Sequence, residues 1–172
     1  MRVIISISLC LLTSCTIQKS NRGFKTMEFK GGQGGFQLKV PLNWEYYNQQ
    51  GIDSYVGEIV TTQNDTLHFD LGRYSNSLSY PLYRGDNDQD ESKYKSKVYW
   101  KKINGYNVKF ACHRTESSSD YGVYFDSVWT INNSDDWRDK VKLTIYGFNL
   151  SKNTKQELRA AIKTVKFITV PN

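Results

Sequence analysis

The histidine in "TLHFDLG" is a residue whose neighbours could support chemistry. The apolar residues of this stretch occupy alternate positions, so a strand would project His68 and Asp70 together from its polar face. A carboxylate beside an imidazole can hold a tautomer for base catalysis or supply two arms of a metal site. No third ligand or nucleophile falls in register with them, which favours an ordinary polar strand face with a modest ion pair.

Cys112 and His113 form a second pair of reactive residue types, in "YNVKFACHR". Adjacent side chains of a strand point to opposite faces, so His113 is badly placed to activate Cys112. We therefore expect Cys112 to be a buried, inert thiol.

The acidic run "DNDQDE" places Asp86, Asp88 and Asp90 at the first, third and fifth positions of an EF-hand loop. Glu91 stands where that loop needs glycine, and Lys97 stands where it needs glutamate. The run is therefore interpreted as a solvated acidic loop. We expect no metal and no other cofactor.

Three tyrosines, Tyr74, Tyr80 and Tyr83, lie in the long segment from Gly72 to Lys97, where no helix or strand pattern would bury them. Exposed aromatic rings on loops can stack on glycans or fill a partner's pocket. Alternatively, they fold back over the sheet as anchors of the loop. We take these tyrosines and the three aspartates of the acidic run as the candidate partner surface.

The apolar run at residues 3–12 is too short to cross a membrane as a helix, which needs about 20 residues. It follows Arg2 and ends in "LTSC", which resembles the lipobox of bacterial lipoproteins, with Cys15 as the mature N-terminus. The resemblance implies a diacylglyceryl group on the Cys15 sulfur, an acyl chain on its amine, and stable attachment to a membrane. The alternative is a plain secretory signal with a chance cysteine.

This interpretation divides the chain into a signal peptide (1–14), a lipidated N-terminus with a glycine-rich flexible tether (15–35) and a single domain (36–172). A short strand at residues 27–29 is the alternative within the tether. Nucleic acid is a poor partner for an exported protein, so the net charge of +6 indicates solubility or attraction to anionic lipid. With Cys10 removed and Cys15 lipidated, Cys112 has no disulfide partner.

Alternating apolar residues predict a strand at 36–41 and three hairpins. The Asn104-Gly105 pair favours the left-handed conformation of a type I′ turn and is the clearest of the hairpin signals. The three expected hairpins pair 55–62 with 66–72, 97–103 with 106–114, and 121–132 with 140–149.

Helical periodicity replaces this alternation near the C-terminus. Thr154 and Glu157 have the spacing of a capping box. The apolar residues that follow fall on one face of a helix, namely Leu158, Ala161, Ile162 and Val165. A second, short helix is expected near 44–50. The predicted fold class is α+β, a meandering antiparallel β-sheet packed by a C-terminal amphipathic helix.

The two ends of the domain resemble a known family. "GGFQLKVPLNWEYY" is similar to the opening strand of the PsbP-like fold, and "LRAAIKTVKF" is similar to its closing helix and last strand. The family includes photosystem accessory proteins and bacterial envelope lipoproteins of the DcrB type. The resemblance implies an antiparallel sheet flanked by helices and a non-enzymatic accessory role, and it carries over no functional residue.

We therefore expect an exported, lipid-anchored envelope module without catalytic activity that docks to a protein partner. In a cell that has an outer membrane, Thr16 after the anchor cysteine resembles the pattern of sorting to that membrane, with the domain either periplasmic or surface-facing. Two alternatives stay open: a glycan-binding surface lipoprotein, and an enzyme or metal-binding protein that uses His68 and Asp70.

Overall fold

The structure is a computed structural model that describes residues 23–32, 34–78, 95–114, 119–131 and 136–169. Within these ranges the chain forms two antiparallel sheets, one α-helix and a single 3₁₀ turn, η2 (Trp137–Asp139). No helix in the described part is both long and apolar enough to cross a membrane.

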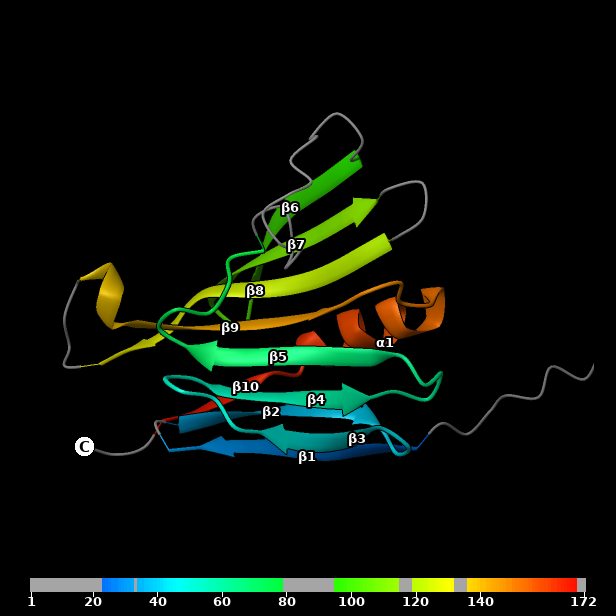
Figure 1. Ribbon diagram of the computed structural model, residues 1–172, viewed down its shortest axis with the longest axis horizontal. Helices are drawn as coiled ribbons and strands as arrows, with labels where there is room; N and C mark the ends of the chain where they lie inside the picture. Colours follow the sequence, from blue (N-terminus) through cyan, green and yellow to red (C-terminus); the bar gives the residue numbers. More distant parts are fainter. Residues whose placement is uncertain (1–22, 33, 79–94, 115–118, 132–135, 170–172) are drawn as a thin grey trace, which may run out of the picture.

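The large sheet has seven strands in the order β3-β4-β5-β9-β8-β7-β6 (Figure 1). Each neighbouring pair is antiparallel. Its strands are β3 (Glu45–Gln49), β4 (Tyr55–Val60), β5 (Thr66–Gly72), β6 (Lys95–Ile103), β7 (Tyr106–Arg114), β8 (Ser119–Thr130) and β9 (Lys140–Gly147).

The small sheet has three strands in the order β1-β2-β10. They are β1 (Phe24–Gly31), β2 (Gly34–Pro41) and β10 (Lys166–Thr169). This sheet and α1 (Lys152–Ile162) lie against one face of the large sheet, which we call its inner face (Figure 1). The core between the layers is aromatic, with Phe29 stacked on Phe36 at 4.3 Å and both rings edge-on to Phe69.

The single meandering sheet that the sequence predicts is therefore replaced by two sheets. Within the large sheet, the meanders β3–β5 and β6–β9 join where β5 pairs with β9. The connection from β5 must then reach the opposite edge at β6, four inter-strand spacings or about 19 Å away. This distance explains why that connection is so long.

The described start of this connection crosses the outer face of the large sheet. The Ser75 and Thr144 hydroxyls lie 2.6 Å apart, and the Ser77 carbonyl accepts a hydrogen bond from Lys109 Nζ at 2.8 Å. Leu78 is buried in a small apolar cluster on β7 and β8. This part of the loop thus folds onto the sheet as an anchored crossing.

The flexible tether predicted for residues 15–35 contains a core strand, β1. Met27 and Phe29 of this strand are buried, and the whole strand pairs with β2. The glycines that follow this strand belong to the β1–β2 turn, where side chains at most of these positions would collide with neighbouring residues. The alternative of a short strand at residues 27–29 is therefore confirmed, although the strand is longer, and the tether prediction is wrong for the residues of β1. The domain begins before residue 36.

The short helix predicted near residues 44–50 is also wrong, because Glu45–Gln49 form β3. Trp44, just before this strand, is fully buried, and its Nε1 donates to Glu157 Oε2 at 3.3 Å. The two tyrosines of the stretch suit a strand better than a helix.

The strand at 36–41 and the three predicted hairpins are confirmed. Asn104 and Gly105 have φ values of 52° and 88°, the left-handed conformation that the turn requires. These elements depend on local patterns, which the sequence displays directly.

Helix α1 begins one turn earlier than the capping box predicts. Ser151 is the N-cap, and its hydroxyl accepts from the Thr154 backbone N–H at 3.1 Å. Thr154 itself is buried, and its hydroxyl donates to Gln63 Oε1 at 3.1 Å. The helix contacts β2 and buries Leu158, Ala161 and Ile162.

Candidate functional site

The structure does not join His68 and Asp70 into a site. Both lie on β5, but His68 Nδ1 lies 3.3 Å from Glu58 Oε1 on the neighbouring strand β4. The His68 ring also packs against Tyr146 at 5.3 Å. Among the described residues, no group of three His, Cys, Asp or Glu side chains could hold a metal ion.

Asp70 lies instead beside the β3–β4 loop, where it interacts with Ser54. Its Oδ1 is buried and has no hydrogen-bond partner among the described residues. Burial raises the pKa of Asp70, the nearby charge of Asp53 raises it further, and the hydrogen bond with Ser54 lowers it. The net effect is a carboxyl group that holds its proton above the usual pH range for aspartate.

Cys112 and His113 lie on opposite faces of β7, as expected, but their burial differs from the prediction. Cys112 is partly exposed and packs against the core from the inner face. His113 is the buried member of the pair, at 3% exposure. The reason is the start of the β5–β6 connection, residues 75–78, which crosses the outer face and brings Leu78 against this part of the sheet. Local periodicity in the sequence could not predict that this segment covers His113.

His113 is the centre of a polar row that spans three strands, with Ser96 paired to it from β6 and Asp120 from β8. Ser96 Oγ lies 2.7 Å from His113 Nδ1. Burial lowers the pKa of His113, although a hydrogen bond to the Leu78 backbone and the charge of Asp120 act against that shift. The Asn104-Gly105 turn sets this register, so the Ser96–His113 pairing could have been found from the sequence.

This serine, histidine and aspartate row contains residue types found in hydrolases, but its geometry fits a structural link better. The Ser96 hydroxyl meets Nδ1 of an imidazole that is almost fully enclosed. A nucleophile's base must exchange protons with a bound substrate, which this enclosure opposes. We interpret the row as a structural contact that links the edge strand β6 to the neighbouring strands β7 and β8.

The candidate partner surface from the sequence is only partly described. Tyr74 is 60% exposed, and the Arg73 guanidinium lies over its ring at 5.7 Å. The other members fall outside the described residues, as does the predicted lipidation site Cys15; those members are Tyr80, Tyr83, Asp86, Asp88 and Asp90.

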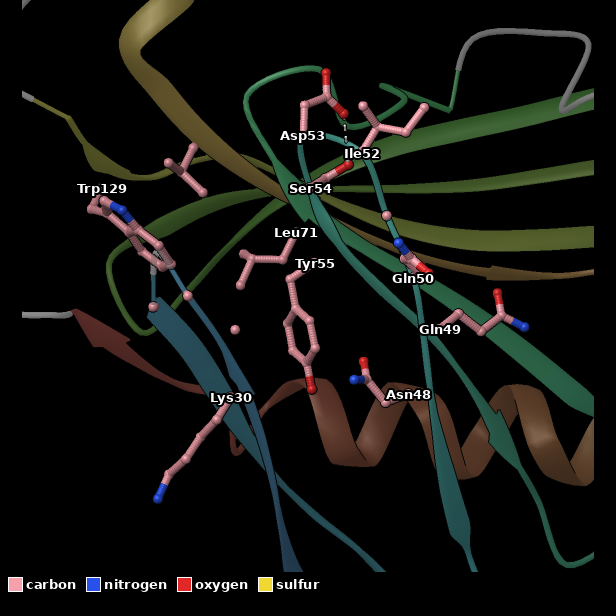
Figure 2. A pocket seen from close by; sticks show the side chains of 15 residues that line it. Lys30, Asn48, Gln49, Gln50, Ile52, Asp53, Ser54, Tyr55, Leu71 and Trp129 are labelled. Carbon is pink, nitrogen blue, oxygen red and sulfur yellow. Dashed lines mark hydrogen bonds between the residues drawn. The ribbon is translucent and has the colours of Figure 1, made fainter.

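A pocket of about 380 Å³ opens where strands of both sheets end (Figure 2). It is lined by the last residues of β1 and β3, the first residue of β2, the β3–β4 loop, and residues near the ends of β5, β8 and β9. We call it the strand-end pocket. No sequence motif marks it, because its residues come together only through the pairing of distant strands.

Glycines of the β1–β2 turn allow two aromatic rings to form the pocket's wall. A Cβ added at Gly31 would lie 2.6 Å from the Tyr55 ring, and one added at Gly34 would lie 2.7 Å from the Trp129 ring. Gly34 also has a φ of 129°, which side-chain-bearing residues rarely adopt. Gly31 and Gly34 thus allow the rings of Tyr55 and Trp129 to pack directly against the backbone of the turn.

The two sides of the strand-end pocket differ in chemistry. In the view of Figure 2, Trp129, Leu71 and Tyr55 lie on one side of it. The amides of the β3 end and the following loop line the other side, and Asp53 and Ser54 add a carboxylate and a hydroxyl; the amides are those of Asn48, Gln49 and Gln50.

Tyr55 is held in place by a hydrogen bond between its hydroxyl and that of Tyr46. Burial raises the pKa of Tyr55, so the phenol stays neutral at physiological pH. The pocket therefore combines aromatic surface with mostly uncharged hydrogen-bonding groups, a composition typical of sites for small polar ligands.

No protein-family model matches the chain, and no curated protein matches it either. The likeness to the PsbP-like family therefore stays a prediction.

Proposed function

We propose that this protein is a lipid-anchored envelope module that binds a glycan in the strand-end pocket. The observation that carries the proposal is the placement of the Trp129 ring opposite the amides of Asn48 and Gln50. The C–H face of a sugar ring packs on an aromatic ring, while its hydroxyls both donate and accept hydrogen bonds. Side-chain amides offer one donor group and one acceptor, which matches that need.

The size and charge of the pocket support a sugar over other small ligands. Its volume of about 380 Å³ lies at the lower end of the range for ligand pockets. Only Lys30 and Asp53 bring ionisable charge to the lining, one of each sign, so a neutral ligand fits best. We therefore expect a ligand of one or two sugar units.

The placement of the pocket supports the anchored arrangement. The described chain begins next to the first residue of β1, Phe24, and the pocket lies at the last residue of that strand, Gly31. An anchor at Cys15 would hold the domain from the end opposite the pocket. The ligand site would then face away from the membrane.

We propose docking to a protein partner as a second function, because the edge strand β6 exposes large apolar side chains. Val98 is 45% exposed and Trp100 is 54% exposed, both on the outer face. Exposed tryptophan is enriched at protein interfaces. Two lysines flank this pair on the strand, which discourages unspecific strand pairing at the edge.

For the fold we propose the α+β class, with α1 as an amphipathic helix packed on the sheets. The burial of Leu158, Ala161 and Ile162 on one face of α1 supports this assignment. A PsbP-like relationship is consistent with it and adds no functional residue.

The glycan proposal is tested with the Asn48→Ala/Gln50→Ala variant of the full chain, purified in a non-ionic detergent. Both side chains are exposed, so the fold should survive their loss. A screen on an immobilised glycan panel, followed by calorimetry with the best binder, should show affinity reduced by about ten-fold or more, or about 1.4 kcal/mol.

The matched control is Asn153→Ala/Gln156→Ala, which removes the same two amides from the exposed side of α1. This control should bind the glycan like the unchanged protein. A panel on which the unchanged protein binds no glycan, or an equal loss in both variants, would contradict the proposal.

A further inference from the structure

Another hollow lies between the β6–β7 hairpin and the C-terminal half of α1, and it shares no lining residue with the strand-end pocket. It measures about 450 Å³ and has an aromatic and aliphatic base formed by Tyr99, Phe110 and Ile103. Three cationic side chains surround that base, and we call the hollow the basic cleft; the three are Lys101, Arg159 and Lys163. Lys102 lines it only through its place on the strand, because its side chain shares the outer face with Trp100.

No carboxylate lines the basic cleft. Within the described part of the chain, none of its three cations lies within ion-pair distance of an aspartate or glutamate. Cations elsewhere do find such partners, as Arg138 does with Asp136. Three like charges that converge without a counter-charge repel one another, and a bound anion would relieve that repulsion.

Arg159 is held in place by Tyr121. Its Nε donates to the Tyr121 hydroxyl at 2.8 Å, and its guanidinium lies over the Tyr121 ring at 5.1 Å. Burial raises the pKa of Tyr121 to about 12, so the phenol is neutral and leaves the arginine charge uncompensated. A guanidinium has five N–H donors, and the remaining four are not used by Tyr121.

The end of α1 would normally oppose an anion, because the last carbonyls of a helix carry partial negative charge. Here the last helical carbonyls already accept hydrogen bonds, that of Ala161 from the Thr164 N–H and that of Ile162 from the Val165 N–H. The Asn104 amide covers two further carbonyls just after the helix. Its Nδ2 donates to the carbonyl of Lys163 at 3.2 Å and to that of Val165 at 3.0 Å. The turn residue that begins β7's hairpin thus also reduces the negative potential at the cleft.

We propose that the basic cleft binds a phosphate-bearing anion. Three cations exceed what one carboxylate needs, and a guanidinium fork with two ammonium groups beside it suits the several oxygens of a phosphate. The aromatic base would contact the organic part of a phosphate ester. This site is separate from the glycan pocket and does not depend on the glycan proposal.

Calorimetry on the full chain in a non-ionic detergent tests the proposal with two probes, inorganic phosphate and dihexanoyl phosphatidylglycerol. The Lys101→Gln/Lys163→Gln variant should weaken binding about ten-fold, because each lost cation removes a charge-assisted contact. Neither lysine side chain makes a hydrogen bond in the described structure that the fold would lose.

Lys152→Gln/Lys166→Gln is the control, since it removes two exposed lysines outside the cleft and changes the net charge equally. It should change affinity less than two-fold, which distinguishes a site from general attraction. Binding of both probes supports a site for the phosphate group itself, and binding of the lipid probe alone supports a headgroup site. The proposal is overturned when neither probe binds, or when the control loses as much affinity as the cleft variant.

Discussion

At the residue scale, Asp70 shows how packing changes the behaviour of a side chain that the sequence marks only as polar. The sequence places it two residues from His68, but its notable property is the buried, unpaired Oδ1 beside the β3–β4 loop. The sequence could not show this, because the cover comes from a loop that precedes β4. His68 likewise takes its carboxylate partner from the neighbouring strand, where Glu58 lies.

The raised pKa of Asp70 predicts a pH dependence of stability. The native state keeps a proton on Asp70 at pH values where the unfolded chain, with its ordinary value near 3.8, has lost it. The contribution of Asp70 to stability is therefore fully present below that value and is lost as the pH rises through the raised pKa. Asp70→Asn should remove this loss.

Thermal unfolding of both proteins across pH 3 to 7 measures the effect. Relative to the unchanged protein, Asp70→Asn should gain stability as the pH rises above the ordinary aspartate range. Parallel stability curves for the two proteins would show that the carboxyl titrates normally and that burial does not govern it.

Gly34 gives a second prediction at this scale. An added Cβ would lie 2.7 Å from the Ile168 carbonyl oxygen, and the residue has a φ of 129°. Gly34→Ala should therefore destabilise the fold by about 1–3 kcal/mol in chemical denaturation. Gly32→Ala is the matched control, because nothing lies within 4 Å of its added Cβ, and it should change stability by less than about 0.5 kcal/mol. Similar losses at both sites would argue against a tightly seated turn.

At the scale of elements, the sequence predicts what local patterns determine. The alternation of apolar residues gives β2, and the Asn104-Gly105 signal gives the β6–β7 hairpin with its register. The pairing of β5 with β9 has no local signal, since it joins strands about 70 residues apart in the chain. The division into two sheets and the strand-end pocket both depend on that pairing and on the pairing of β10 with β2. Neither feature can therefore be predicted from the sequence alone.

The strand β1 illustrates a conflict between composition and pattern. Four glycines within five residues favour a tether, yet Met27 and Phe29 just before them alternate with polar residues as a strand requires. The structure resolves the conflict in favour of the strand, because the glycines form the turn that follows it.

Phe29→Ala tests whether β1 belongs to the core. Phe29 is fully buried and stacks on Phe36, so its truncation should cost about 3–5 kcal/mol in denaturant unfolding. Thr26→Ala on the exposed side of the same strand should cost less than about 1 kcal/mol. Equal, small effects of the two substitutions would show that this segment does not contribute to the core and would support the predicted tether.

At the scale of the whole molecule, the two ends of β1 separate the proposed anchor from the proposed ligand site. The strand has eight residues and so spans roughly 25 Å. Gly23 and Leu42 meet at one end, where the Leu42 N–H donates to the Gly23 carbonyl at 3.1 Å. Ile52 lies at the other end, fully exposed at the rim of the strand-end pocket.

This separation predicts how the anchored protein stands on a membrane. A fluorophore on Leu42→Cys should be quenched strongly by lipids that carry a quencher in the headgroup, whereas one on Ile52→Cys should be quenched weakly. Both side chains are exposed, and a Cys112→Ser background keeps the label at one site. The measurement uses the full, lipid-modified chain in vesicles.

Cys15→Ala supplies the control for the anchor itself, because lipidation at Cys15 is what the "LTSC" motif predicts. Without the lipid, the mature domain should leave the membrane fraction, or an unprocessed precursor should accumulate. Processing and membrane attachment like those of the unchanged protein would contradict the lipobox interpretation.

With the anchor intact, equal quenching at both labels would mean that the domain lies along the membrane, and stronger quenching at Ile52→Cys would place the pocket against it. Either result would remove the argument that the strand-end pocket faces a ligand away from the membrane.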